Sequence, residues 1–295
     1  MAHVPVLLDE VIRWLRLDPA GTFVDCTLGG GGYAEAILKH LTTGRLIAID
    51  RDPRAIEAAR ERLRPFGNRI IYWRASYSEI GRLWEWLGEP PGTVRIAGMV
   101  ADLGVSREQL EDPGRGFSFL TDGPLDMRLD PEQPMTAARI VNHYGEKPLA
   151  ELIFRFGEER RSRRIARAIV RARPVVSTRK LAEVIERAAP RTPRERIHPA
   201  TRTFQALRIA VNDELGELEK LLEAAPPLLA SGGRLVVVSF HSLEDRLVKQ
   251  ALRRWAGSGV LEILTKHVIR PGEGEVRSNP ASRSARLRAA EKRMN

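Results

Sequence analysis

The sequence predicts an α/β fold, in which a mostly parallel sheet is covered by helices on both faces and interrupted by an all-helical insertion. Apolar, strand-like runs alternate with helical segments through the first hundred residues. Only helical periodicity follows over residues 131–210, and strand character returns at 233–239. Near-continuous apolar strands separated by helices are typical of a parallel sheet. We therefore expect a sheet domain made of residues 1–130 and 211–295, with residues 131–210 as the inserted helical domain.

Four strands are expected in the first hundred residues, because each run is short and rich in aliphatic or β-branched side chains. These runs are residues 22–27, 45–50, 69–73 and 95–102. Pro53 favours the first turn of a helix, which we expect to run from Arg54 to about Arg64.

The C-terminal part repeats the strand-then-helix order. After the strand at 233–239, Ser242 stands three residues before Asp245, which is the spacing of a capping box. We expect Ser242 to cap a helix that runs to about Trp255, and a last strand near residues 284–288.

The composition predicts a folded, cytoplasmic protein with no membrane partner. Hydrophobic residues make up 43% of the 295 residues and charged residues 29%, which permits a sizeable core. Cys26 is the one cysteine, so a disulfide framework and a thiolate zinc cluster are excluded, and the histidines show no metal-ligand spacing. The N-terminus lacks a basic signal-peptide region, and no apolar run approaches the ~20 residues that span a bilayer. These features leave an oligomer possible.

The charge balance favours a polyanionic partner. There are 48 Lys and Arg against 38 Asp and Glu, a net charge of +10, and most of the cations are Arg. Guanidinium groups bind phosphate bidentately and stack on bases, so a nucleic acid is one candidate. A general bias toward Arg would give the same balance.

A glycine-rich turn follows the first expected strand. Gly29 to Gly32 lie between that strand and a helix expected from Ala34 to Leu41, where glycine lets backbone N–H groups approach a ligand. Asp50 ends the second strand, where a carboxylate can accept both ribose hydroxyl groups. The pair predicts a cofactor that carries adenosine.

Two cofactors and a plain turn compete for this pattern. Gly29-x-Gly31-x-x-Ala34 matches a relaxed dinucleotide fingerprint. Asp25, directly before the turn, opposes a pyrophosphate but suits the ammonium group of S-adenosyl-L-methionine, which we therefore favour. Tyr77, just past the third strand, is placed to cover an adenine or to pack in the core. Asp102 ends the fourth strand at the edge of the same crevice.

Longer strings of residues cover almost the whole chain, in order. They are His3-Val-Pro-Val-Leu-Leu-Asp-Glu10, Ala48-Ile-Asp-Arg-Asp-Pro53, Asp102-Leu-Gly-Val-Ser106, Arg115-Gly-Phe-Ser-Phe119, Asp122-Gly-Pro-Leu-Asp-Met-Arg128, Gly157-Glu-Glu-Arg160, Arg164-Ile-Ala-Arg-Ala-Ile169, His198-Pro-Ala-Thr-Arg-Thr-Phe-Gln205, Ser239-Phe-His-Ser-Leu-Glu-Asp-Arg246 and Asn279-Pro280. Through these strings the chain resembles a known family, the bacterial 16S ribosomal-RNA (cytosine-N4) methyltransferases called RsmH or MraW.

The resemblance implies a class I S-adenosylmethionine-dependent methyltransferase, Rossmann-like, with a helical insertion. The implied reaction is methylation of N4 of one cytosine in the decoding region of 16S rRNA within the small ribosomal subunit. The implied cofactor-binding residues are Gly31, Gly32, Tyr33, Asp50, Tyr77, Asp102 and Gln109. The family usually has His in place of Tyr33, Phe in place of Tyr77, and Ser-Pro where this chain has Arg107-Glu108. Both tyrosines keep an aromatic surface, whereas the changed loop leaves the placement of Gln109 open.

Two residues are candidates for the chemistry. The lone pair of cytosine N4 is delocalised into the ring, so an acceptor near its N–H favours attack. Asp102 is one candidate, because the chain lacks the Asp/Asn-Pro-Pro-aromatic motif that many amino-methyltransferases use. His241, at the end of the fifth strand, could contact the base or a phosphate, or could fix the turn before the next helix.

A basic stripe is expected on the insertion. Arg160, Arg164, Arg167 and Arg171 follow helical spacing and are predicted to bind the RNA backbone, although a solvated face paired with Glu158 and Glu159 would look the same. Three rival functions stay open: a DNA amino-methyltransferase, an inactive Arg-rich RNA-binding or ribosome-assembly factor, and a nucleotide-linked oxidoreductase.

Overall fold

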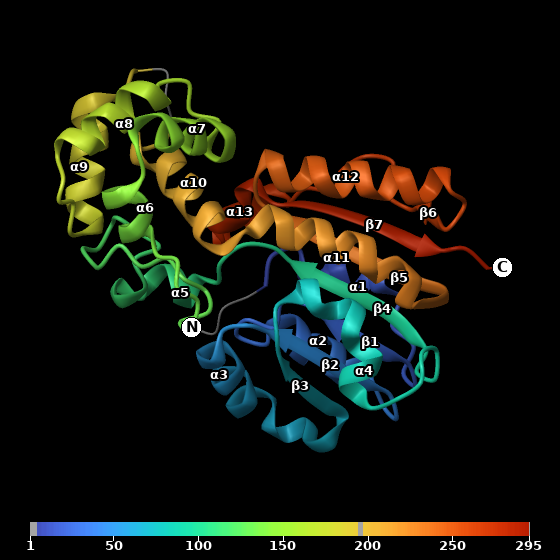
Figure 1. Cartoon of the computed structure of the whole chain (residues 1–295). Coiled ribbons are helices and arrows are strands. Elements are labelled where there is room, and N and C mark those ends of the chain that lie inside the picture. The colour runs from blue at the N-terminus through green and yellow to red at the C-terminus, as the bar shows by residue number, and fades with distance from the viewer. Residues whose placement is uncertain (1–4, 194–196, 295) are drawn as a thin grey trace. The chain divides into compact units, whose positions relative to one another are not determined.

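The computed structural model describes residues 5–193 and 197–294, and these form two compact units. The first consists of Met1–Gly104 and Leu215–Asn295, and the second of Val105–Glu214 (Figure 1). The second unit begins before the expected boundary at residue 131 and ends after the one at 210. His3 and Val4, the first two residues of the first family string, lie outside the described residues.

A seven-stranded sheet runs through the first unit in the order β3-β2-β1-β4-β5-β7-β6. The first five strands in this order are parallel, whereas β7 is antiparallel to both β5 and β6. The strands are β1 (Thr22–Asp25), β2 (Arg45–Asp50), β3 (Ile70–Arg74), β4 (Ile96–Asp102), β5 (Leu229–Ser239), β6 (Leu261–Ile263) and β7 (Arg286–Lys292). This confirms the expected mostly parallel sheet.

Side chains on each strand alternate between two hydrophobic cores, one on each face of the sheet. Val24 and Ile47 belong to the first core, and their neighbours Phe23 and Leu46 belong to the second. The alternation follows from the two-residue period of a strand. Both faces are apolar, so both need a cover of helices.

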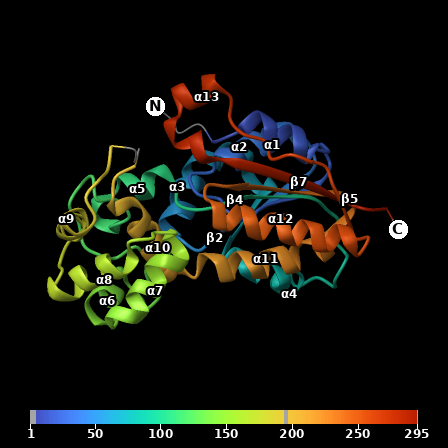
Figure 2. The same ribbon diagram turned by 90° about the horizontal axis from the view of Figure 1, so that it is seen from above.

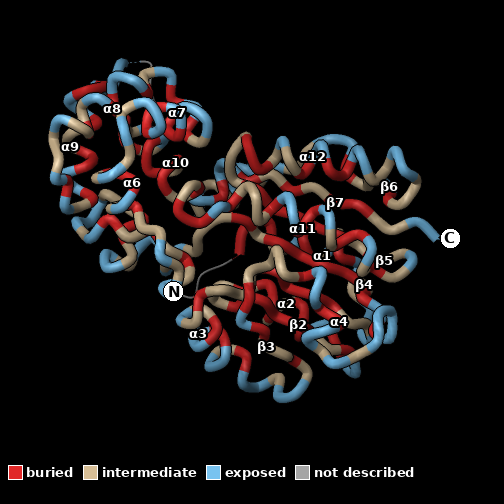
Figure 3. Tube along the Cα trace, in the orientation of Figure 1, coloured by how far each residue is buried: buried red, intermediate tan, exposed pale blue. Residues whose placement is uncertain are grey.

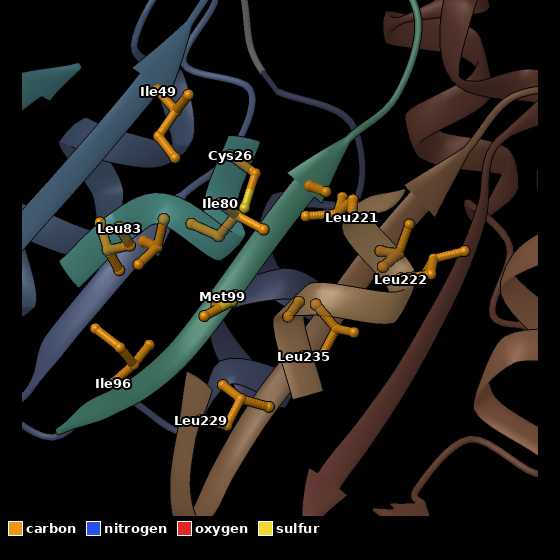
Figure 4. Packing of buried hydrophobic residues seen from close by; sticks show 14 of the residues in the cluster. Cys26, Ile49, Ile80, Leu83, Ile96, Met99, Leu221, Leu222, Leu229 and Leu235 are labelled. Atoms are coloured by element: carbon orange, nitrogen blue, oxygen red, sulfur yellow. The ribbon is translucent and has the colours of Figure 1, made fainter. Parts of the chain in front are cut away.

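The helices of the first unit divide between these two faces. Those over the first core are α4 (Leu83–Leu87), α11 (Glu214–Leu228) and α12 (Ser242–Gly257), together with the 3₁₀ turn η2 (Tyr77–Arg82). Those over the second are α1 (Leu8–Leu15), α2 (Gly32–His40) and α3 (Pro53–Leu63). Figure 2 shows α1 and α2 on one side of the strands, and α4, α11 and α12 on the other. Figure 4 shows part of the first core, to which Cys26 just after β1, Met99 of β4 and Leu221 of α11 contribute.

Two short helices and three further 3₁₀ turns complete the described chain, apart from the five other helices of the second unit. They are η1 (Arg64–Arg69), α13 (Glu273–Ser278), η4 (Pro280–Ser284) and, in the second unit, η3 (Pro113–Arg115) with α5 (Arg107–Glu111). Figure 3 shows the burial along the trace, with buried segments running through the strands.

The second unit has its own core, built from the inward faces of five helices. They are α6 (Ala137–His143), α7 (Glu146–Gly157), α8 (Ser162–Arg171), α9 (Thr178–Ala188) and α10 (Ala200–Asn212). Residues before 131 share this core, since Leu125 and Met127 are buried in it. Asn212 fixes this loop: its amide donates to the Met127 carbonyl at 2.7 Å and accepts from Leu129 N–H at 2.8 Å. These contacts explain why the unit begins before residue 131. The loop carries little helical periodicity of its own, so the sequence pattern placed the boundary too late.

Several local expectations need correction. The cap of α12 is His241 and not Ser242, because the His241 side chain accepts from Glu244 N–H. Arg160 lies in the turn before α8 rather than on it. The strand β6 was not predicted, because its three residues carry too little pattern. Among the described residues, none of the helices has both the length and the apolar character needed to cross a membrane.

Candidate cofactor site

Three acidic residues end three neighbouring strands. Asp25 ends β1, Asp50 ends β2 and Asp102 ends β4, and β1 lies between the other two in the sheet. Because these strands are parallel, their carboxyl ends meet at one edge, the usual ligand site of an open α/β sheet. The structure thus brings together three of the acidic residues that the sequence singled out.

The glycine turn closes over this edge. Gly29 N–H donates to Asp50 Oδ2 at 2.8 Å, and Asp52 N–H donates to Asp50 Oδ1 at 2.8 Å. Gly31 has a φ of 77°, which glycine adopts without strain, and it precedes the first turn of α2. A side chain at this position would press on Leu63 and Ala59 of α3. Glycine therefore allows the turn to lie against α3 with its backbone open to a ligand.

Asp50 is held in place but retains capacity to accept further hydrogen bonds. Each carboxylate oxygen accepts one backbone N–H, and each has a further lone-pair site. Burial raises the pKa of Asp50, while the bonds from Asp52 and Gly29 oppose that rise. Ribose hydroxyl groups are neutral donors that suit such a preorganised carboxylate.

Asp25 and Asp102 carry the least satisfied polar atoms of the site. Asp25 Oδ1 accepts from Thr27 N–H at 3.1 Å, but Asp25 Oδ2 and Asp102 Oδ1 are buried without a hydrogen-bond partner in the described part of the chain. Burial raises the pKa of Asp25 to about 7, with Asp50 adding to the rise. Burial also raises the pKa of Asp102 well above its usual range, with the charges of Asp25 and Glu244 adding.

Buried carboxylates without partners indicate a missing cationic ligand. Unsatisfied buried polar groups are costly, and functional sites are where they are retained. An ammonium or sulfonium group beside Asp25 and Asp102 would supply the absent positive charge. A pyrophosphate in the same place would add negative charge to it. The residues present therefore fit S-adenosyl-L-methionine better than a dinucleotide.

Tyr33 and Gly32 are directed at the N-terminal segment. The Tyr33 hydroxyl donates to the Val6 carbonyl, and the Tyr33 side chain is buried. A side chain at Gly32 would collide with the ring of Pro5. These two predicted cofactor residues lie at the end of the glycine turn, and each contacts residues just before α1.

Tyr77 is held in a short turn by a distant helix. Tyr77 begins η2, directly after β3, and is half-buried against the first core. On either side of it, the hydroxyl groups of Ser76 and Ser78 both donate to Glu217 of α11. Lys220 pairs with the other oxygen of Glu217 at 3.0 Å. Sequence reasoning missed Glu217, because only the fold brings α11 to this turn.

Gln109 lies in the second unit and serves as a cap there. Its side-chain carbonyl accepts from Ser106 N–H at 2.9 Å, and its own N–H donates to the Ser106 hydroxyl at 3.2 Å. The two bonds form the capping box of α5. Gln109 thus stabilises the start of α5 within the second unit, and its cofactor role stays a prediction.

His241 is built into the turn between β5 and α12. Its Nδ1 accepts from Glu244 N–H at 3.3 Å, and its Nε2 lies 3.1 Å from Glu244 Oε1. Glu244, itself buried, accepts from Phe240 N–H at 2.8 Å. The structure thus gives His241 a capping role. The His-x-x-Glu spacing is the signal that could have shown this in the sequence.

The Arg residues of the predicted stripe are exposed on the second unit. Arg164 and Arg171 lie on α8 with no side-chain partner among the described residues, and Arg167 pairs with Glu146 at 3.2 Å. Arg160 is exposed in the preceding turn. Arg163 is also exposed on α8 and was not predicted. The inward face of α8 is buried at Ile165, Ala166 and Ile169.

Comparisons with known proteins agree on one family. Residues 1–293 match the model described as the MraW methylase family. The chain is 54% identical to the ribosomal RNA small subunit methyltransferase H of Acidobacterium capsulatum, over 99% of this chain and 98% of that protein. It is 53% identical to the protein of the same name from Solibacter usitatus, over 99% of this chain and 100% of the other.

Solved structures are similar to the chain only at a much lower level of identity. An rRNA methylase from Streptococcus thermophilus is 13% identical, with a TM-score of 0.42, over 99% of this chain and 100% of that one. The N-methyltransferase NodS from Bradyrhizobium japonicum is 11% identical, with a TM-score of 0.45, over 97% and 94%. The assignment therefore depends on the family model and the close relatives. On that evidence, the chain belongs to the MraW methylase family.

Proposed function

We propose that this protein transfers a methyl group from S-adenosyl-L-methionine to N4 of one cytosine in the decoding region of small-subunit rRNA. Membership of a methylase family supports the reaction class and the cofactor. The names of relatives that are 47–54% identical support small-subunit rRNA as the substrate. The cytosine N4 target comes from the resemblance of the motifs alone.

One observation carries the proposal: the two buried carboxylates that lack partners beside the glycine turn. Asp25 Oδ2 and Asp102 Oδ1 are both buried and both unpaired in the described residues. Asp25 is placed to pair with the ammonium group of the cofactor, and Asp50 is placed to hold its ribose. When bound, S-adenosyl-L-methionine supplies an electrophilic methyl group.

The substrate amine needs an acceptor rather than a strong base. The lone pair of N4 is delocalised into the cytosine ring, and a hydrogen bond from N4–H favours the pyramidal geometry required for attack. Asp102 is our candidate for this acceptor, because its Oδ1 is preorganised at the end of β4 and has no competing donor. After transfer, one N4 proton must leave, and a carboxyl group whose pKa is raised can receive it.

His241 is better suited to positioning than to proton transfer. Its Nδ1 is engaged by Glu244 N–H, and its Nε2 faces the carboxylate of the same residue. A direct contact of His241 with the base stays a prediction. Its capping bond fixes the start of α12 and the carboxylate of Glu244, whose charge acts on Asp102.

The helical unit is proposed to hold the RNA backbone. Arg164 and Arg171 are exposed and have no carboxylate partner in the described chain, so their charge is available to phosphates. Such contacts attract RNA without reading its sequence. The target base must leave its stack to reach a methyl group in a crevice, so a single-stranded or looped segment is expected.

The proposal is tested by binding and transfer in parallel. We expect the protein to bind S-adenosylhomocysteine and not NAD, and to transfer label from S-adenosyl-L-methionine to unmodified small ribosomal subunits but not to duplex DNA. Preference for NAD would indicate an oxidoreductase, and label in DNA would indicate a DNA methyltransferase. RNA binding without cofactor binding would indicate an assembly factor.

A further inference from the structure

We propose that residues 5–7 form a strap over the glycine turn, that Glu275 is the positioning residue that latches it, and that opening of the strap sets the rate of cofactor exchange. The cofactor part of this inference rests on the proposed function. Residues 5–7 belong to a string that the sequence analysis singled out only as a family match. Their contacts give that string a physical role.

The strap lies directly on the turn. The ring of Pro5 occupies the space that a side chain at Gly32 would need. The next residue, Val6, is buried, and its carbonyl accepts a hydrogen bond from the hydroxyl group of Tyr33, the neighbour of Gly32. Two consecutive residues of the strap are therefore in contact with Gly32, the last residue of the turn, and with Tyr33, which follows it.

One residue of the strap, Leu7, has an energetically unfavourable backbone conformation. Leu7 has φ 52° and ψ 37°, a left-handed conformation that is unfavourable for a residue with a Cβ atom. Leu7 is almost fully buried and precedes the first turn of α1 without a side-chain cap. Such strain persists only where surrounding contacts determine it, and it is common at ligand clamps.

Glu275, near the C-terminus, accepts the hydrogen bond that holds Leu7 in this conformation. Leu7 N–H donates to Glu275 Oε1 at 2.7 Å, across 268 residues of sequence. Without this bond the N–H would be a buried donor with no acceptor, which is costly. Because the acceptor is a carboxylate, the bond is of the stronger, charge-assisted kind. Glu275 lies on α13, whose outer residue Glu273 is exposed.

Tyr33 interacts with the strap and with the acidic edge of the sheet. Its hydroxyl donates to the Val6 carbonyl, and the charges of Asp102, Asp25 and Glu275 add to the rise that burial causes in its pKa. Pro5 covers Gly32 directly. On the proposed function, a cofactor at the glycine turn would lie against the residues that the strap covers, and its release would require the strap to move.

The test uses the full-length protein and two substitutions of Glu275. Glu275→Ala removes the acceptor, Glu275→Gln restores a neutral one, and Glu273→Ala is the matched control on the same helix. Hydrogen exchange at the Leu7 amide is measured without ligand, and the dissociation rate of S-adenosylhomocysteine is measured by competition. For Glu275→Ala we expect both rates to rise about tenfold, as the loss of a buried hydrogen bond implies. Glu275→Gln should recover part of each effect, and Glu273→Ala should change neither.

Two results would overturn the inference. Unchanged exchange at Leu7 in Glu275→Ala would show that Glu275 does not latch the strap. Faster exchange with an unchanged dissociation rate would show that the strap is a purely structural contact. If the wild-type protein binds no S-adenosylhomocysteine, the proposed function fails, while exchange at Leu7 still decides whether the latch exists. If Glu275→Ala does not fold, Glu275→Gln alone decides the question, since its neutral acceptor weakens the charge-assisted bond and should raise both rates by a smaller factor.

Discussion

Replacing Asp25 with asparagine is expected to change stability and cofactor affinity in opposite directions. The Asp25 carboxylate is buried, and its pKa is about 7 in the folded protein against 3.8 for an ordinary aspartate. At 1.36 kcal/mol for each pH unit, holding this group ionised costs the folded protein about 4 kcal/mol above pH 7. Such a cost is reasonable only where function requires the charge.

The sign of the pH dependence follows from the proton count. Between about pH 4 and pH 7 the folded protein binds a proton at Asp25 that the unfolded chain has released. The free energy of unfolding therefore falls as pH rises through this window. Asp25→Asn removes this dependence. At pH 8 it should add about 1–3 kcal/mol, since the gain of about 4 kcal/mol is offset by an amide N–H₂ left without an acceptor.

Cofactor affinity should move the other way. A cationic ligand needs the ionised carboxylate, so wild-type affinity should fall about tenfold for each pH unit below 7. Asp25→Asn should bind S-adenosylhomocysteine about 10- to 100-fold more weakly at pH 8, with a shallower pH profile than the wild type. Urea unfolding and calorimetric binding at pH 5 and pH 8 measure both quantities. A variant that is less stable than wild type at pH 8, or that keeps its affinity, would refute the reasoning.

Four further predictions concern the cofactor, the substrate and the supporting residues. Asp50→Ala should weaken the binding of S-adenosylhomocysteine by about tenfold or more, while the affinity for RNA stays unchanged. An equal loss of both affinities would indicate misfolding, which circular dichroism would detect. Arg164→Ala should leave cofactor binding intact and reduce the slope of log affinity against log salt for RNA by about 0.7–0.9, and an unchanged slope would exclude a phosphate contact. Glu217→Ala should raise the KM for the cofactor several-fold with little change in kcat, because it removes the acceptor of the hydroxyl groups on both sides of Tyr77. The control Glu223→Ala, at an exposed position on the same helix, should leave this KM unchanged. His241→Ala should lose about 1 kcal/mol of stability with the cap, and His241→Asn, which keeps a capping acceptor, should retain most turnover; loss of turnover in both variants at full stability would favour contact with the base.

The sheet and its crevice could be predicted because their signals are local. Each central strand is an apolar run between turn residues, and Asp25, Asp50 and Asp102 occupy the ends of such runs. Parallel pairing of these strands then brings their carboxyl ends to one edge of the sheet. The chemistry of the site was thus readable from residue type and position.

What could not be predicted depends on contacts between distant segments. Leu7 meets Glu275, and the residues around Tyr77 meet Glu217, only after the chain has folded. The start of the second unit was misplaced because Leu125 and Met127 join a helical core from a loop without helical period. The cap at His241 was missed because the more common capping residue, serine, follows it directly.

The central claim is most directly tested by identifying the methylated nucleoside. Small ribosomal subunits that lack the modification are incubated with labelled S-adenosyl-L-methionine and the protein, then digested and analysed by nucleoside mass spectrometry, with Asp50→Ala as the control. The account predicts label in N4-methylcytidine, at a single cytosine of the decoding region, and none with the variant. Label in another nucleoside, or no label from a protein that binds the cofactor and the subunit, would contradict it.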